Sequence, residues 1–189
     1  MDLATNLPIM MIRQDLDDIP FYPLPAPYAF RGYKPGDEAL WRQLQTGADR
    51  YNEITPQLFG QEFGTDQARL AERQLYLCED DGRPVGTSTA WVDEHFQDPT
   101  YGRIHWVAIL PAWQGQGLAK PLLSLTCQRL KALGHQRVYL TTESARIPAL
   151  NLYLKFGFKP YITSSTEEQL WQELVGQLKE PLGSMIYRG

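Results

Sequence analysis

A nearly continuous apolar strand followed by a glycine-rich turn most narrows what this chain can fold into. Residues 103–110 read RIHWVAIL, which predicts a strand covered on both faces. Pro111 ends this strand, and the segment 114–119 (QGQGLA) opens a helix predicted over 117–133. The first amides of a helix have no partner within it, so small residues here let their N–H groups approach an anion such as a pyrophosphate.

The rest of the chain predicts a mixed α/β (α+β) sheet in one domain, because a strand-rich first half precedes a β–α–β–α–β order. Strands are predicted at 28–33, 75–78, 85–92, 103–110, 137–142, 158–162 and 185–187. Helices are predicted at 37–46, 66–73, 117–133, 148–156 and from 165 to about 178, with a weaker stretch from 55. Asp37 and Gly47 are expected to cap the first helix, and a capping box is expected to begin at Ser165.

The N-terminal segment is set apart by its prolines, at positions 8, 20, 23, 25 and 27. Because proline fixes φ and lacks an amide donor, residues 19–27 are expected to be extended and without ladder pairing. The chain is therefore divided into a proline-rich arm, residues 1–27, and a single domain, residues 28–189.

Charge and cysteine content exclude several classes of protein. The 189 residues carry 18 basic and 22 acidic side chains, so no chain-wide basic field favours nucleic acid as a partner.

Cys78 and Cys127 lie in apolar runs, which predicts two buried thiols in a reducing compartment. The three histidines lack the spacing of a zinc site, and no metal is expected. No apolar run approaches the roughly 20 residues of a membrane span, and the start lacks a basic signal region, so a cytoplasmic protein without membrane contact is expected.

The glycine turn matches one of three phosphate-binding patterns. The P-loop needs Gly-Lys-Ser/Thr where Ala119-Lys120-Pro121 stands, and the dinucleotide fingerprint needs glycine or alanine at Lys120. The pattern Gln/Arg-x-x-Gly-x-Gly/Ala is met by Gln114, Gly117 and Ala119. In this the turn resembles the acyl-CoA loop of the GNAT superfamily of N-acetyltransferases.

A second segment extends the resemblance over residues 103–161. The family typically shows Asn-x-x-Ala-x-x-Leu-Tyr-x-x-x-Gly-Phe after a strand, and this chain has Ala149, Leu152, Tyr153, Gly157 and Phe158 in register. Arg146 stands where that asparagine is usual. An arginine there could reach a cofactor phosphate or a substrate carboxylate, or simply be a solvated residue at a helix start.

The resemblance implies a GNAT-like central sheet, mixed and mostly antiparallel, with splayed middle strands and flanking helices. Acetyl-CoA is then the cosubstrate, held between the strands 103–110 and 137–142. Backbone groups of Val107, Ala108 and Ile109 are expected to pair with its pantetheine, and an N–H at the end of that strand, at Ile109, to polarise the thioester carbonyl. The amides of the turn are expected to hold its pyrophosphate; they belong to Gly115, Gln116, Gly117, Leu118, Ala119 and Lys120.

Such a reaction includes two proton transfers, which need a general acid and a general base. Tyr153 stands at the family's usual general-acid position; the alternative is a tyrosine that only packs in the helix face. The candidates for the base are His105, Glu143 and Glu94. His105 has the parity of Val107 and Ile109, which predicts that it faces the cleft while Trp106 points to the opposite face. The alternative is a core histidine bonded to backbone.

The reaction implied by the resemblance is transfer of an acetyl group from acetyl-CoA directly to a primary amine of a small molecule or peptide. Two other functions stay open: a non-catalytic acyl-CoA-binding or sensing domain of the same fold, and a nucleotide-binding module. A homodimer through the helix around Trp171 is a further option, although packing of that helix on its own domain is favoured.

Overall fold

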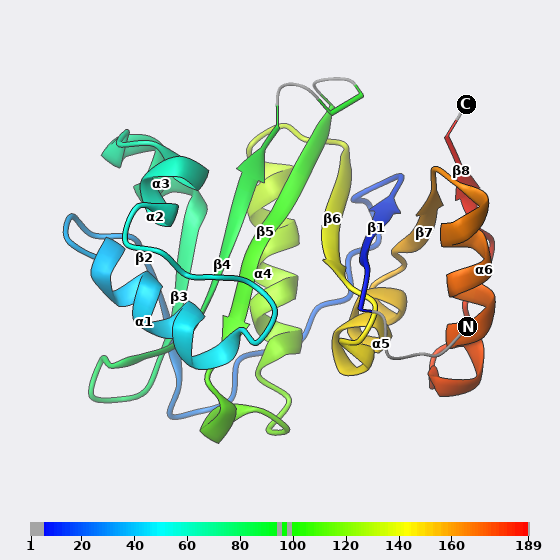
Figure 1. Ribbon diagram of the computed structural model, residues 1–189. Helices are drawn as coiled ribbons and strands as arrows, with labels where there is room; N and C mark the ends of the chain where they lie inside the picture. Colours follow the sequence, from blue (N-terminus) through cyan, green and yellow to red (C-terminus); the bar gives the residue numbers. More distant parts are fainter. Residues whose placement is uncertain (1–5, 94–95, 98–99, 189) are drawn as a thin grey trace.

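Eight strands form one mixed, mostly antiparallel sheet in the order β2-β3-β4-β5-β6-β1-β7-β8 (Figure 1). The computed structural model describes residues 6–93, 96–97 and 100–188. Within these, the strands are β1 Pro8–Arg13, β2 Ala29–Gly32, β3 Gln74–Cys78, β4 Pro84–Val92, β5 Tyr101–Ile109, β6 Arg137–Glu143, β7 Lys159–Ile162 and β8 Ile186–Tyr187. The mixed sheet with flanking helices confirms the predicted fold class.

Helices cover both faces of the sheet. The α1 face is covered by α1 Glu38–Ala48, α2 Leu58–Phe63 and α3 Gln67–Arg73, whose buried residues form one cluster with Tyr76 and Trp91. The α4 face is covered by α4 Ala119–Ala132, α5 Ile147–Lys155 and α6 Ser165–Leu174, which share a second cluster with Ile104 and Leu140. None of the helices in the described ranges is both long and apolar enough to cross a bilayer.

The parallel strands β5 and β6 pair only where they begin. Tyr101–Arg103 lie opposite Arg137–Tyr139, and from there β5 stays with β4 while β6 stays with β1. The two strands therefore diverge toward their carboxyl ends, as Figure 1 shows, and leave a V with its narrow end at Arg103. This confirms the predicted splay of the middle strands.

Strand β1 lies inside the sheet, antiparallel to both β6 and β7. Its residues Ile9, Met11 and Ile12 are fully buried. The segment expected as a proline-rich arm thus contributes a central strand, which the sequence interpretation did not include. Residues 19–27 form no strand, as expected, and are held against α4 by the bond from the Tyr22 N–H to Ser124 Oγ (3.2 Å).

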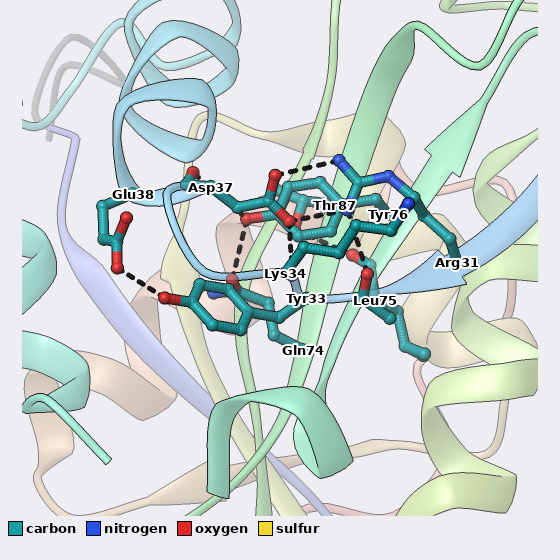
Figure 2. Close-up of polar contacts among 10 residues, drawn as sticks. Arg31, Tyr33, Lys34, Asp37, Glu38, Gln74, Leu75, Tyr76 and Thr87 are labelled. Atoms are coloured by element: carbon teal, nitrogen blue, oxygen red, sulfur yellow. Dashed lines mark hydrogen bonds and ion pairs between the residues drawn. The ribbon is translucent and has the colours of Figure 1, made fainter. Parts of the chain in front are cut away.

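The start of α1 is anchored to β2 through the Asp37 carboxylate (Figure 2). Arg31 donates to its two oxygens at 2.6 and 3.0 Å, and the Lys34 N–H donates at 2.7 Å. Asp37 precedes the helix as expected, but its side chain closes the preceding turn and caps no helical N–H. Deeper in Figure 2, the Tyr76 hydroxyl donates to Gln74 Oε1 at 2.8 Å, and burial raises the pKa of Tyr76 far above 10.

Two helix ends differ from expectation. Helix α1 continues through Gly47, and a Cβ there would lie 2.7 Å from Leu110 Cδ2, so this glycine lets α1 approach the residue that follows β5. The cap of α6 is Ser164, whose Oγ accepts from the Glu167 N–H, one residue before the predicted Ser165. By contrast, Gly157 ends α5 at φ +78°, in the left-handed region that favours glycine.

Candidate active site

Beyond Arg103, none of the described strands pairs with the edge of β5 that faces the V. The Leu110 N–H donates to Val85 O on β4 at 2.9 Å, whereas the Ile109 carbonyl accepts from Gln114 Nε2 at 2.7 Å. Because successive residues of a strand direct their backbone groups to opposite sides, Val107 and Ile109 face the V. Ala108 lies opposite Thr87, so its backbone groups belong to the β4 ladder. Of the three residues expected to pair with the pantetheine, Val107 and Ile109 therefore direct their backbone groups into the V, whereas Ala108 does not.

The glycine turn lies at the wide end of this V, before α4. Gly115 and Gly117 have φ of +76° and +80°, and no atom lies within 4 Å of a Cβ built on either. In the described part of the chain, no group accepts a hydrogen bond from the N–H of residues 115–119. Such a row of unpaired donors at the positive end of a helix is suited to an anion.

The side chains beside the turn hold it in shape. Gln116 accepts from the Tyr28 hydroxyl at 3.0 Å and donates to Ala112 O at 3.1 Å. Leu118 is buried against α4, and the Lys120 ammonium lies 5.4 Å from the centroid of the Tyr22 ring. The turn is thus fixed from both ends, and the N–H groups of residues 115–119 have no acceptor among the described residues.

A β-bulge in β5 overturns the predicted direction of His105. Thr89 lies opposite His105 and Thr87 opposite Ala108, so β5 has one extra residue, and Trp106 has a φ of +52°. His105 and Trp106 therefore both lie on the α1 face, while Val107 and Ile109 pack on the α4 face. The prediction failed because side-chain alternation holds only along an unbroken ladder.

His105 is paired with Glu62 of α2, a residue that the sequence interpretation missed. His105 Nε2 lies 2.7 Å from Glu62 Oε2, and the imidazole packs edge-on against the ring of Phe63 at 5.5 Å. A neutral imidazole that donates from Nε2 keeps Nδ1 free as an acceptor. The signal in the sequence was weak: Phe59 and Phe63, one helical turn apart, mark the buried face beside Glu62.

The two groups of this pair have shifted pKa values. Burial lowers the pKa of His105 below 6.5, and the bond to Glu62 only partly opposes it. The hydrogen bond from His105 lowers the pKa of Glu62, which burial partly offsets. At neutral pH the site therefore holds a neutral imidazole beside an ionised carboxylate, and the imidazole can accept a proton.

Tyr153 approaches the V from the other face. It lies in α5, is almost fully buried, and belongs to the same cluster as Ile104 and Leu140, one from each diverging strand. Its hydroxyl bonds to none of the residues that the structure describes, and burial raises its pKa to about 12. Tyr153 and His105 thus lie on opposite faces of the sheet.

The remaining predicted residues lie at the carboxyl end of β6. Glu143 Oε2 accepts from Asn6 Nδ2 at 2.8 Å, so it contacts the N-terminal segment. The Arg146 guanidinium pairs with Asp49 at 2.9 Å and lies 4.9 Å from the centroid of the Tyr51 ring. Glu94 lies outside the described residues.

Comparison with known proteins identifies the family. The model of the acetyltransferase (GNAT) family matches residues 38–158, more than half of the chain. A mycothiol acetyltransferase of Thermomonospora curvata is 30% identical over 161 residues, covering 81% of this chain and 52% of that protein. One of Pseudarthrobacter chlorophenolicus is 29% identical, covering 75% and 45%. The chain spans about half the length of these curated relatives.

Solved structures share the fold. A GCN5-related N-acetyltransferase from Sphaerobacter thermophilus has a TM-score of 0.65 at 23% identity, over 82% of this chain and 48% of that one. The ribosomal-protein-S18-alanine N-acetyltransferase from Escherichia coli has a TM-score of 0.57 at 17% identity, over 69% and 76%. Together with the family match over the splayed strands and the glycine turn, these findings show that the chain belongs to the GNAT family of acetyltransferases.

Proposed function

We propose that this protein transfers an acetyl group from acetyl-CoA to a primary amine. The observation that carries the proposal is the row of unpaired N–H groups at residues 115–119, together with the edge of β5 that no described strand pairs with beyond Arg103. The turn has room and donors for a diphosphate, and the strand edge offers the ladder groups that an extended pantetheine amide can use. The thioester then lies inside the V, between the glycine turn and the narrow end.

In the proposed reaction the amine nitrogen attacks the thioester carbonyl carbon. A C–N bond forms, the C–S bond breaks, and the sulfur leaves as a thiolate. In this proposal the Ile109 N–H, on the side of β5 away from β4, stabilises the developing oxyanion. No metal takes part in this proposal.

Tyr153 is proposed as the donor to the leaving thiolate. Burial raises the pKa of Tyr153 to about 12, above the value of about 8.5 for a thiol, so the proton transfer is uphill. That cost is acceptable within an enzymatic barrier, and it falls if the bound cofactor supplies a hydrogen-bond partner to the hydroxyl.

His105 is proposed as the acceptor of the ammonium proton, directly or through water. It lies on the opposite face from Tyr153, so the incoming amine and the leaving sulfur have separate proton partners. Glu143 is the alternative base, although its carboxylate is engaged by Asn6. Arg146 remains a candidate for a cofactor phosphate only if it exchanges its Asp49 partner.

The relatives named for mycothiol favour a small-molecule acceptor over a peptide. The alternative function is a sensor that binds acyl-CoA without turnover. Thiol release from acetyl-CoA, measured across a panel of amines with wild type and Tyr153→Phe, distinguishes the two. Turnover that Tyr153→Phe loses supports the enzyme, whereas tight binding of coenzyme A in calorimetry with no thiol release on any amine supports the sensor.

A further inference from the structure

We infer that Arg103 recognises a carboxylate on the acceptor, so that the preferred substrate is an amine with a carboxylate a few bonds away. This inference rests on the proposed function. Arg103 lies outside the glycine turn and is neither the proposed acid nor a proposed base.

Arg103 occupies the narrow end of the V on the face of the proposed base. It is the last residue of β5 that pairs with β6, opposite Tyr139, and it lies beside Trp91 of β4. His105 follows two residues later, before the bulge, so both side chains lie on the α1 face, about 7 Å apart along the strand. An acceptor held at Arg103 is therefore within reach of His105.

The Arg103 guanidinium lacks an anionic partner. Its CZ atom lies 5.6 Å from the centroid of the Tyr139 ring, and among the described residues it has no ion pair and no hydrogen bond. Its Nε is buried and unpartnered. Arg13, Arg31 and Arg146, which are also partly or fully buried, each have a carboxylate partner. The planar guanidinium of Arg103 therefore lies against the Tyr139 ring with N–H donors that have no acceptor in the described ranges. Such a group can bind a carboxylate bidentately.

The neighbouring carboxylates already have partners. Glu62 is bonded to His105, and Asp93 accepts from the Tyr139 hydroxyl at 2.7 Å. The positive charge of Arg103 is close enough to His105 to contribute to its lowered pKa. The charge of Arg103 also contributes to the lowered pKa of Glu62, but no described carboxylate forms an ion pair with it. A substrate carboxylate bound to Arg103 would form that ion pair, with the substrate's amine facing the imidazole.

The test compares amino acids with their carboxamides as acceptors, by thiol release from acetyl-CoA. Wild type is expected to prefer the acid by about 10- to 100-fold in kcat/KM. Arg103→Gln is expected to bring that ratio close to one, and Arg103→Glu to reverse it. Arg137→Gln is the matched control, because its guanidinium lies over Tyr101 at 5.5 Å but away from His105, and it should keep the wild-type ratio.

The outcomes distinguish a failure of the Arg103 inference from a failure of the proposed acetyltransferase function. If wild type acetylates amides as well as acids, or if Arg103→Gln keeps the preference, the inference is wrong while the enzyme proposal stands. Thermal melting and a coenzyme A titration establish that the variants are folded. Should no acceptor turn over, calorimetry of N-acetyl amino acids with coenzyme A present decides: equal affinity for wild type and Arg103→Gln overturns the inference, and weaker binding to the variant supports it.

Discussion

Asp49 and Arg146 form an ion pair, with 2.9 Å between Oδ2 and Nη2, that joins the end of α1 to the start of α5. The same carboxylate accepts from the N–H groups of Tyr51 and Asn52 and from the Asn52 side chain, at 2.8 to 3.1 Å. Helix α1 packs on β4 and β5, whereas α5 follows β6, so the pair links the two sides of the V. Its carboxylate side chain is only 4% exposed.

Asp49→Ala is expected to lower the free energy of unfolding by about 2–4 kcal/mol, because it leaves several donors and a half-buried guanidinium without an acceptor. Denaturant unfolding measures this. Asp17→Ala is the matched control: its pair with Lys131 at 3.1 Å is exposed, and less than about 1 kcal/mol is expected. Equal losses in the two variants would contradict a structural role for the Asp49 pair.

The Asp49 pair also predicts a dependence of stability on pH. Burial tends to raise the pKa of Asp49, but the bonds from Tyr51, Arg146 and Asn52 outweigh it and hold the pKa below its ordinary value. A carboxyl with a lower pKa in the folded state stabilises above its unfolded pKa of about 3.9, and that contribution disappears as the pH falls through the folded value. The stability difference between wild type and Asp49→Asn should therefore persist from pH 5 to 7 and shrink below pH 4.

Gly117→Ala is expected to weaken binding of coenzyme A at least tenfold, because a Cβ at φ +80° strains the turn that presents the N–H donors. Isothermal calorimetry measures the affinity. Gly134→Ala provides the control, since its φ of +88° and open surroundings match, but it lies beyond the other end of α4. Comparable weakening in both variants would mean that strain in α4, and not the turn, controls binding.

Tyr153→Phe is expected to reduce kcat by about 10²- to 10⁴-fold with little change in stability. The hydroxyl bonds to no described residue, so its removal breaks no contact within the protein, and the ring keeps its packing on Phe158 at 6.0 Å. Steady-state kinetics measures the change in kcat, and thermal melting measures the change in stability. A variant with the wild-type kcat would exclude Tyr153 as the acid.

The His105 pair predicts the acidic limb of the pH–rate profile. Because burial holds the pKa of His105 below 6.5, activity should rise with pH along a limb below 6.5 and then level off. Glu62→Gln removes the carboxylate that favours the charged imidazole, and so should move this limb to still lower pH. An unmoved limb would assign the titration to another group.

Met11→Ala tests whether the N-terminal strand is part of the core. Met11 is fully buried in the cluster that the sheet shares with α4, α5 and α6, so a loss of about 2–5 kcal/mol is expected from denaturant unfolding. Met10, its neighbour on the other face, is only partly buried, and Met10→Ala should cost less. A small effect at both positions would show that β1 contributes little to stability.

Local sequence determined the parts of this protein that depend on neighbours along the chain. The strand, the glycine turn and α4 could be predicted because an apolar run, a proline and two glycines with positive φ follow one another within about fifteen residues. The placement of Tyr153 in a helix could also be predicted, because Gly157, four residues later, marks the end of that helix.

Tertiary structure alone decided the residues that meet across the fold. Strand β1 pairs with β6, more than a hundred residues later, and a strand of six mostly apolar residues does not specify such a partner. The bulge at Trp106 moved His105 to the α1 face, because one extra residue reverses every direction inferred from alternation. Glu62, Asp49 and Arg103 acquire their roles from distant elements, since the contacts of a charged side chain depend on what the fold brings within a few ångströms of it.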